Sequence, residues 1–178
     1  MCVEDEKMTI IYTLGYEGTD VQQFITTLLR AGVEVVADVR AVPLSRKKGF
    51  SKKRLSERLA CAGIEYLHFA DLGNPRHGRE AAKAGNITKF HRVYLKHLST
   101  IHAQTALKQL AELCTSRAIC LLCFEREPTD CHRTLIASEL SSCGIDRVDL
   151  FTDSSGQNVR SHRVVRSRNI DQSIAAAE

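Results

Sequence analysis

The sequence predicts a single α/β domain, a Rossmann-like three-layer α/β/α sandwich with about five mainly parallel strands. Short apolar, β-branched runs alternate with stretches whose apolar residues recur at helical spacing. Three helix-to-strand junctions share one pattern, with Gly32, Gly63 or Gly144 followed by a β-branched residue. Because strand and helix alternate, the strands are expected to pair in parallel through right-handed crossovers. The usual winding of such sheets predicts the strand order 3-2-1-4-5.

The first half of the chain supplies three strands and two helices. Thr9–Leu14 is a short apolar run that ends at Gly15, as a buried strand does. Thr19 or Asp20 then caps a helix with apolar residues at helical spacing, which ends at Gly32. The elements that follow are a strand over Val33–Val39, a polar loop over Arg40–Gly49, a helix over Lys52–Ala62 capped by Ser51 with Leu55 and Leu59 inward, and a strand over Ile64–Phe69.

The second half begins with a long loop over Ala70–Asn86, rich in glycine and charge, with room for one short helical turn. Loops of this length in compact domains are usually functional or mobile. The remaining elements are a helical pattern from Thr88 to about Cys114 with a break near Ser99 and Thr100, an apolar strand over Ala118–Phe124, a helix capped by Thr129 or Asp130 that ends at Gly144, and a strand over Arg147–Phe151.

The composition places the chain among ordinary globular proteins. Its 178 residues, 43% of them hydrophobic, suit one domain over residues 9–153, with an acidic leader at 1–8 and a basic, flexible tail at 154–178. No segment has the apolar length of a membrane span, and the acidic N-terminus lacks the apolar run of a secretory signal. We therefore expect a cytoplasmic protein with no membrane partner, whose seven cysteines are free thiols.

Positive charge is concentrated in one segment. Residues 40–60 carry eight basic side chains against one acidic, and the tail adds a balance of +2, although the whole chain is only +4. The first turn of the predicted helix at Lys52 is basic, where the helix dipole prefers acids. A phosphate-backbone contact or a solvated basic face would each explain this segment. The candidate nucleic-acid patch consists of Lys47, Lys48, Lys52, Lys53 and Arg54.

Polar residues follow the predicted strands, and ligands of open α/β sheets bind outside the carboxyl ends of the strands. Tyr16 and Glu17 follow the first strand, Arg40, Ser45 and Arg46 the second, His68 and Asp71 the third, and Glu125, Arg126, Cys131, His132 and Arg133 the fourth. So much charge at one rim predicts an anionic ligand with acid and base groups nearby.

Four sequence motifs carry a resemblance to a known family. They are Thr13-Leu-Gly-Tyr-Glu-Gly18; Asp38-Val-Arg-Ala-Val-Pro-Leu-Ser-Arg46 with Gly49-Phe50; Tyr66-Leu-His68 with Leu72-Gly73; and Leu122-Cys-Phe-Glu125 with Pro128 and Cys131-His-Arg133. Together they resemble a widespread prokaryotic family catalogued as domain of unknown function 488, over roughly Thr9 to Phe151. Leu72-Gly73-Asn74 departs from the double glycine typical of that stretch. The resemblance implies no established reaction.

Arginine dominates the predicted ligand contacts, because its fixed bidentate donors suit phosphate. An alternative for Arg40 is an ion pair with Asp38 or Glu125 that only stiffens the rim. The expected anion-binding residues are Arg40, Arg46, Arg126 and Arg133, with Ser45, Tyr16 and Asp71 as further substrate contacts.

The catalytic candidates are Glu125 as the leading acid or base, together with Glu17, His68 and His132. Cys131 falls in the first turn of a predicted helix beside His132 and Arg133, and these surroundings lower a thiol pKa. The alternative is a small buried residue at a strand-to-helix turn.

A metal site is not predicted. Cys120 and Cys123, with Cys131 and His132 as further ligands, have the spacing of a metal pair, but residues three apart in a strand face opposite sides of the sheet. We expect neither a metal nor another cofactor.

These observations predict an enzyme, a hydrolase or transferase, that acts on a phosphate-containing ligand, either a nucleotide or a nucleic acid. One alternative is a non-catalytic module that binds nucleic acid through the patch and the tail. Another is sulfur-transfer or redox chemistry at Cys131. The sequence does not define the oligomeric state.

Overall fold

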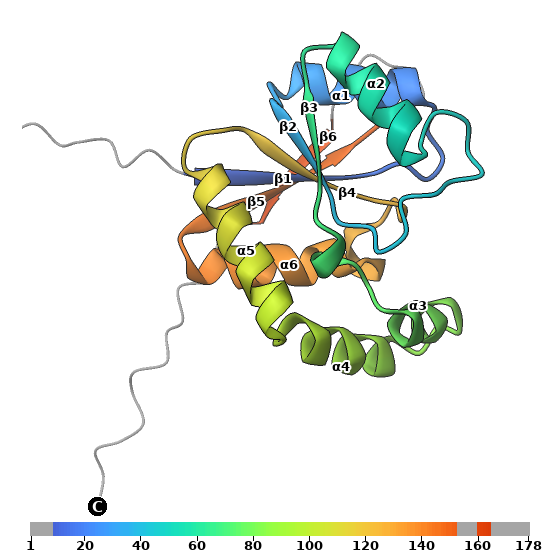
Figure 1. Ribbon diagram of the computed structural model, residues 1–178, viewed down its shortest axis with the longest axis vertical. Coiled ribbons are helices and arrows are strands. Elements are labelled where there is room, and N and C mark those ends of the chain that lie inside the picture. The colour runs from blue at the N-terminus through green and yellow to red at the C-terminus, as the bar shows by residue number, and fades with distance from the viewer. Residues whose placement is uncertain (1–8, 153–159, 165–178) are drawn as a thin grey trace, which may run out of the picture.

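The first five strands of the sheet coincide with the predicted strand segments, and a sixth strand was not predicted (Figure 1). The computed structural model describes residues 9–152 and 160–164. In chain order the strands are β1 (Thr9–Gly15), β2 (Val35–Asp38), β3 (Glu65–His68), β4 (Ile119–Cys123), β5 (Ile145–Phe151) and β6 (Arg160–Val164). β6 lies within the segment predicted as a basic tail. The other predicted tail residues and the leader at 1–8 lie outside the described residues.

The helices also follow the predicted order. They are α1 (Val21–Arg30), α2 (Lys52–Cys61), α3 (Arg76–Lys83), α4 (Ile87–Leu98), α5 (Ile101–Cys114) and α6 (His132–Ser142), with 3₁₀ turns η1 (Ala70–Leu72) and η2 (Pro128–Asp130). Asp20 caps α1 by accepting a 2.8 Å hydrogen bond from the Gln23 amide. The break predicted near Ser99 and Thr100 separates α4 from α5. The predicted long loop contains α3, which is more helix than the single turn expected.

Two predicted helix starts were wrong in detail. Ser51 precedes α2, but its side chain makes no capping bond and instead exchanges 3.1 Å hydrogen bonds with the backbone of Ser45. α6 begins at His132 with Cys131 as its N-cap, because the predicted cap residues Thr129 and Asp130 belong to η2. Capping propensity is local, and here the hydrogen bonds to Ser45 and the 3₁₀ turn η2 engage the predicted cap residues instead.

The order of the strands corrects the predicted 3-2-1-4-5. The sheet runs β3-β2-β4-β1-β5-β6, with parallel pairing from β3 to β5 and β6 antiparallel to β5. β4 therefore lies between β2 and β1. Every residue of β4 is buried, whereas β3, at one edge, is partly exposed. The handedness of crossovers fixes on which face each helix lies, but it does not fix the position of a returning strand.

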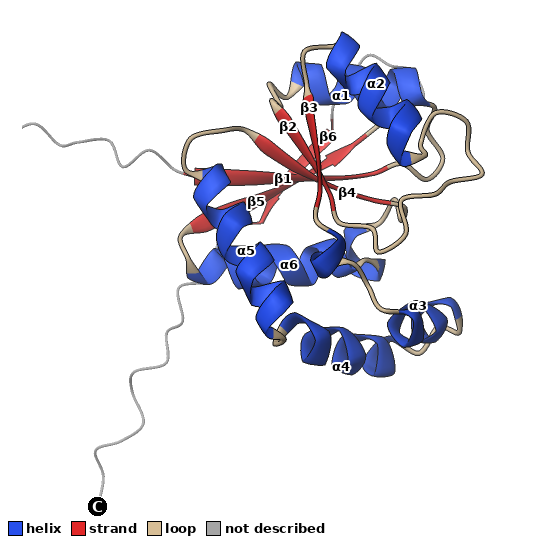
Figure 2. Cartoon of the chain, in the orientation of Figure 1, coloured by secondary structure: helices blue, strands red, loops and turns tan. Residues whose placement is uncertain are grey.

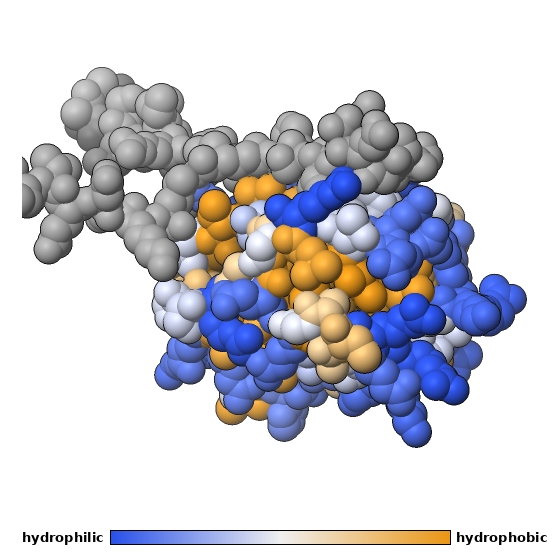
Figure 3. All heavy atoms as spheres, turned by 90° about the horizontal axis from the view of Figure 1, so that it is seen from above, coloured by the Kyte–Doolittle hydropathy of each residue, from blue (hydrophilic) through white to orange (hydrophobic). Residues whose placement is uncertain are grey.

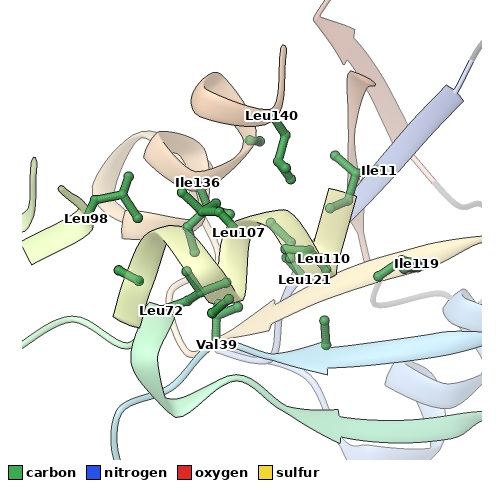
Figure 4. Close-up of a cluster of buried hydrophobic side chains, with 14 of the residues drawn as sticks. Ile11, Val39, Leu72, Leu98, Leu107, Leu110, Ile119, Leu121, Ile136 and Leu140 are labelled. Atoms are coloured by element: carbon green, nitrogen blue, oxygen red, sulfur yellow. The ribbon is translucent and has the colours of Figure 1, made fainter. Parts of the chain in front are cut away.

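Helices cover both faces of the sheet and make two cores (Figure 2). α1 and α2 pack on one face through side chains such as Phe24, Leu28 and Leu55. α5 and α6 cover the other face, where Leu107, Leu110, Ile136 and Leu140 meet Ile11, Ile119 and Leu121 of the sheet (Figure 4). α4 packs against α5 and α6. α3 packs on α4 beside this layer. The predicted three-layer architecture is confirmed.

The surface differs from the two cores. Viewed from the side of α1 and α2, hydrophilic side chains cover much of the molecule and leave apolar patches between them (Figure 3). None of the helices in the described part of the chain has the length and apolar character needed to cross a membrane.

Candidate functional site

A pocket of about 530 Å³ opens where β2, β4 and β1 end side by side. Its floor is the end of β4 with the residues that follow it, and His132 at the start of α6. One wall is the loop after β2, residues 40–47, together with Tyr16, and the other is Asn74 with Arg79 and Lys83 of α3. We call this the rim pocket. It lies at the carboxyl ends of the strands, as predicted for an open α/β sheet.

Four reactive side chains meet at the floor of the rim pocket, where three of them line the pocket and the fourth, Cys131, is buried behind them. Cys123, Glu125, Cys131 and His132 each place one sulfur, oxygen or nitrogen atom so that all four atoms lie within 4.8 Å of one another. The Cys123 thiol donates to Glu125 Oε2 at 2.9 Å. His132 Nδ1 lies 3.6 Å from the Cys123 sulfur and 3.8 Å from the Cys131 sulfur. We call these four residues the thiol–imidazole cluster.

The backbone explains why these four residues meet. Cys123 is the last residue of β4, and Glu125 follows two positions later. η2 then turns the chain back, so that Cys131 at the N-cap of α6 faces the strand that it has just left. Cys120 lies three residues before Cys123 and packs with the α1 and α2 side of the sheet. The strand-parity argument therefore holds for Cys120 and Cys123, but Cys123 meets the other two predicted ligands.

His132 is held in one orientation. Its Nε2 lies 2.7 Å from the Val39 carbonyl oxygen, so Nε2 carries the proton of the neutral ring and Nδ1 faces the sulfurs with its lone pair. The ring of Tyr94 packs edge-on against His132 with centroids 5.2 Å apart. Tyr94 in turn donates a 2.7 Å hydrogen bond to the Leu72 carbonyl. The Val39 carbonyl and the Tyr94 ring thus fix the imidazole from two sides.

The cluster shifts the pKa values of its own members. Burial, together with the neighbouring Cys131, raises the pKa of Glu125 to about 7. Burial also raises the pKa of Cys123. For Cys131 burial acts in the same direction, but a hydrogen bond from Cys123 and the charges of His132 and Arg133 outweigh it, so the Cys131 pKa lies well below its usual value. The pKa of His132 is raised, because the attraction of Cys131 overcomes burial.

Arg133 holds the floor in place from beneath. Its side chain is fully buried. Its guanidinium donates to the Glu125 carbonyl, to the Arg126 carbonyl at 2.8 Å and to Thr13 Oγ1 at 3.2 Å. These bonds tie the residues after β4 to β1. Because these protein groups already engage the buried guanidinium, we assign Arg133 to positioning Glu125 rather than to holding a ligand.

Arg40 lines the rim pocket, but its guanidinium already has protein partners. Nε and Nη2 donate to the two oxygens of Asp38 at 2.8 and 2.6 Å. Nη1 donates to the Tyr16 hydroxyl at 3.1 Å and to the Phe50 carbonyl at 2.9 Å. This is the ion pair with Asp38 that the sequence left open as the alternative for Arg40. Arg40 and Asp38 therefore fix the wall of the pocket.

Free positive charge comes from other residues of the walls. Arg46 and Lys47 project from the loop after β2, and Arg79 and Lys83 project from α3. Arg79 donates to the Asn74 carbonyl at 2.7 Å, and Lys47 to the Tyr16 carbonyl at 3.3 Å. Over the described residues no acidic side chain forms an ion pair with any of these four, and Glu125 is the single carboxylate in the lining. The rim pocket thus carries excess positive charge.

Several predicted site residues lie elsewhere. His68 and Asp71 line a separate pocket against α5, and His68 bonds through Nε2 to the Arg40 carbonyl at 2.9 Å. Glu17 accepts a 3.1 Å hydrogen bond from the Arg126 amide, and Arg126 lies 3.8 Å from Glu127. Ser45 and Tyr16 do line the rim pocket. The structure brings together Glu125, Cys131 and His132, which were all expected after the fourth strand.

Sequence reasoning missed residues in one wall and in the floor of the pocket. Asn74, Arg79 and Lys83 come from the segment interpreted as a loop, and only the length of that loop marked it as functional. The sequence analysis excluded Cys123 as a metal ligand together with Cys120. The two side chains lie on opposite faces of the sheet, so the argument against Cys120 does not apply to Cys123. Because residues three apart in a strand face opposite sides of the sheet, the same argument could have placed Cys123 on the side of α6 once Cys120 was placed on the other side.

The predicted nucleic-acid patch divides between two places. Lys47 is in the rim pocket, whereas Lys48, Lys52, Lys53 and Arg54 are exposed at or near the start of α2 and do not line it. Arg54 pairs with Glu57 at 3.3 Å, and Lys52 Nζ lies 3.3 Å from His68 Nδ1. We call Lys48, Lys52, Lys53 and Arg54 the α2 patch.

Comparison with known proteins gives one finding. A family model described as "Domain of unknown function DUF488" matches residues 20–140, which include α1, the loop after β2, α3, β4 and most of α6. No curated protein and no solved structure matches the chain.

Proposed function

The chain belongs to the domain of unknown function DUF488 family, whose description names no activity, and we propose that it is an enzyme acting on a phosphate-containing substrate in the rim pocket. One observation carries this proposal. Four basic side chains without acidic partners among the described residues surround a floor lined by the carboxylate of Glu125, the imidazole of His132 and the thiol of Cys123. Clefts with one sign of charge attract ligands of the opposite sign.

Arg46, Lys47, Arg79 and Lys83 are the proposed phosphate contacts. A pocket of about 530 Å³ suits a ligand of nucleotide size. Arg40 and Arg133 contribute indirectly, because they hold the wall and the floor of the pocket. This assignment keeps Arg46 from the sequence-based hypothesis and replaces Arg40, Arg126 and Arg133 by residues of the loop and α3.

Glu125 is the proposed acid or base, because it is the carboxylate at the floor and its backbone is held by Arg133. The exposure of the residues supports Glu125 over Cys131 as the group that meets the substrate. Cys131 is only 2% exposed and does not line the rim pocket, whereas Glu125 is partly exposed within it. Transfer or hydrolysis at phosphorus would need such a group to move a proton to or from the attacking or leaving oxygen.

Calorimetric titration with phosphate, nucleoside monophosphates and nucleoside triphosphates tests the binding step. Replacing Arg46 and Lys83 by Ala should weaken binding roughly tenfold or more, because charge-assisted hydrogen bonds contribute about 1.5–3 kcal/mol each. Arg54→Ala is the matched control, since Arg54 is exposed on α2 and outside the pocket. Equal affinity of the double variant and the wild type would contradict the pocket assignment.

Turnover of the same ligands tests the enzyme step against the non-catalytic alternative. We expect Glu125→Gln to bind nucleotide as the wild type does but to lose turnover at least a hundredfold, the usual range for a general acid or base. A wild-type protein that binds phosphate ligands and releases no product from any of them would instead favour a binding module.

We also propose that the protein works in the cytoplasm. The supporting observation is that Cys61, Cys114, Cys120, Cys123, Cys131 and Cys143 are all free thiols, as expected in a reducing compartment.

A further inference from the structure

We infer that Cys123, Cys131 and His132 form a binding site for a zinc-class transition metal ion at the floor of the rim pocket. The inference goes beyond the proposed function, because it depends on the donor geometry alone and needs no anionic substrate. It also reverses the expectation of no metal, which rested on Cys120 and Cys123 as the ligand pair.

The spacing of the donor atoms fits a single ion. Zn–S bonds of about 2.3 Å and Zn–N bonds of about 2.0–2.1 Å, arranged tetrahedrally, place a sulfur and a nitrogen ligand about 3.6 Å apart. His132 Nδ1 lies 3.6 Å from Cys123 Sγ and 3.8 Å from Cys131 Sγ. The imidazole therefore stands at ligand distance from both sulfurs at once.

The orientation of His132 is that of a metal ligand. Histidines that bind metals usually donate their second ring N–H to a carbonyl or carboxylate, which fixes the tautomer and aims the other nitrogen at the ion. Nε2 of His132 has such a partner in the Val39 carbonyl at 2.7 Å. Tyr94 packs against the ring, and α6 holds the backbone of His132. The ligand is therefore positioned by the fold before any ion binds.

Thiolate and imidazole donors select the class of metal. Two sulfurs and one nitrogen suit zinc, cobalt or iron(II), and they are poor ligands for magnesium or calcium, which prefer oxygen. Each cysteine releases its proton to solvent when it binds the ion. The buried guanidinium of Arg133 lies close enough to both cysteines to interact with their charge, which offsets the negative charge that two thiolates bring.

Glu125 lies beside the site without belonging to the ligand set. Its Oε2 is 2.9 Å from Cys123 Sγ, closer than the roughly 3.6 Å that two ligands of one tetrahedral ion would keep. Three protein ligands leave a fourth position for water or substrate, the pattern of catalytic rather than structural zinc sites. Because Cys123, Glu125 and His132 all line the rim pocket, that position is on the pocket side.

Cobalt substitution of the full chain tests the site. The protein is kept reduced with a reductant that lacks thiols, stripped with a chelator and titrated with Co²⁺. We expect one equivalent to bind with thiolate-to-cobalt charge-transfer absorption and tetrahedral ligand-field bands, and we expect Zn²⁺ to abolish both. X-ray absorption of the zinc form should show two sulfur neighbours. Absence of the charge-transfer band in the folded wild type, or a count of zero or four sulfurs, would overturn the inference.

Matched cysteine variants locate the site. Cys123→Ser and Cys131→Ser should each weaken Co²⁺ binding at least tenfold and reduce the charge-transfer band. Cys120→Ala is the control, because Cys120 lies on the same strand and faces the opposite core. Circular dichroism checks that each variant is folded. A band that survives loss of both Cys123 and Cys131, or one that depends on Cys120, would show that the ion binds elsewhere.

Glu125→Gln separates this inference from the proposed function. The variant should lose turnover while it keeps the cobalt band at wild-type intensity, because Glu125 is not a ligand. Loss of the ion in this variant would contradict the three-ligand assignment. A cobalt band in a protein that binds no phosphate ligand would support the metal site and refute the proposed substrate class.

Discussion

Asp38 shows how one buried carboxylate organises the wall of the rim pocket. It is fully buried and accepts hydrogen bonds from Arg40 and from the Tyr66 hydroxyl, the latter at 2.5 Å. Removing one partner of a buried ion pair is strongly destabilising, about 3–5 kcal/mol, because the other charge is left unpaired. The wall of the pocket therefore depends on a charge network that no ligand needs to complete.

Tyr66 makes this network sensitive to alkaline pH. Burial raises the pKa of Tyr66 above its ordinary value of 10, and the hydrogen bond to Asp38 raises it further. Folded Tyr66 thus holds its proton more tightly than unfolded Tyr66, so its contribution to stability is complete below about pH 10 and is lost as the pH rises above that value.

Urea unfolding of the wild type and Tyr66→Phe between about pH 8 and pH 11 measures this contribution. We expect the free energy of unfolding of the wild type to fall more steeply above pH 10 than that of Tyr66→Phe. The other tyrosines and the lysines are common to both proteins, so the difference in slope reports Tyr66. Equal slopes would show that the hydroxyl is not held in the folded state.

At the level of elements, the end of β1 approaches the segment that follows β4 so closely that only glycine fits at position 15. A Cβ added to Gly15 would lie 1.8 Å from the Glu125 carbonyl oxygen. Gly73 is equally constrained, because a Cβ there would lie 2.3 Å from Ala41 Cα. The absence of a side chain at Gly15 lets Glu125 lie directly against the end of β1. The absence of one at Gly73 lets the segment before α3 pack against the loop after β2. Both glycines thus shape the rim pocket.

Gly15→Ala should destabilise the protein by about 3 kcal/mol or more, because the added methyl group meets backbone that cannot rotate away. Gly18→Ala is the comparison within the same motif. Gly18 has φ +76°, but a Cβ there meets nothing within 4 Å, so the expected cost is only about 1–2 kcal/mol of backbone strain. Guanidinium unfolding measures both. A smaller loss at Gly15 than at Gly18 would mean that β1 and β4 can separate.

On the scale of the whole molecule, positive charge occupies two surfaces with different surroundings. The rim pocket is concave and places its charges around the thiol–imidazole cluster. The α2 patch is exposed, and none of its four residues lines the rim pocket. Under the proposed function a small phosphate ligand would bind in the rim pocket alone, whereas a long nucleic acid would contact the α2 patch as well.

Replacing Lys52, Lys53 and Arg54 together by Ala should separate these two surfaces. We expect the affinity for a nucleoside triphosphate to change less than twofold, because none of the three lines the rim pocket. The affinity for a long oligonucleotide should fall, and its dependence on salt should weaken by about one phosphate contact for each charge removed. Loss of nucleotide affinity in this variant would place the ligand on α2 instead.

Much of the fold could be predicted because its signals are local. The glycines at 32, 63 and 144 end helices with positive φ, as the repeated junctions indicated, and Asp20 caps α1. The predicted rim at the carboxyl ends of the strands is where the rim pocket lies. The strand order was wrong, because β4 lies between β2 and β1 through contacts that no single segment encodes.

The sequence by itself determined the α/β class, the alternation of strands and helices, and the region of the chain that carries the reactive side chains. Periodicity, turn residues and motif spacing express these properties within short segments. Only the tertiary structure decided that Arg40 and Arg133 bond to the protein, that Arg79 and Lys83 face the pocket, and that Cys123 meets Cys131 and His132. These outcomes depend on which distant segments approach within a few ångströms, because hydrogen bonds form only at that range and ion pairs are strongest there.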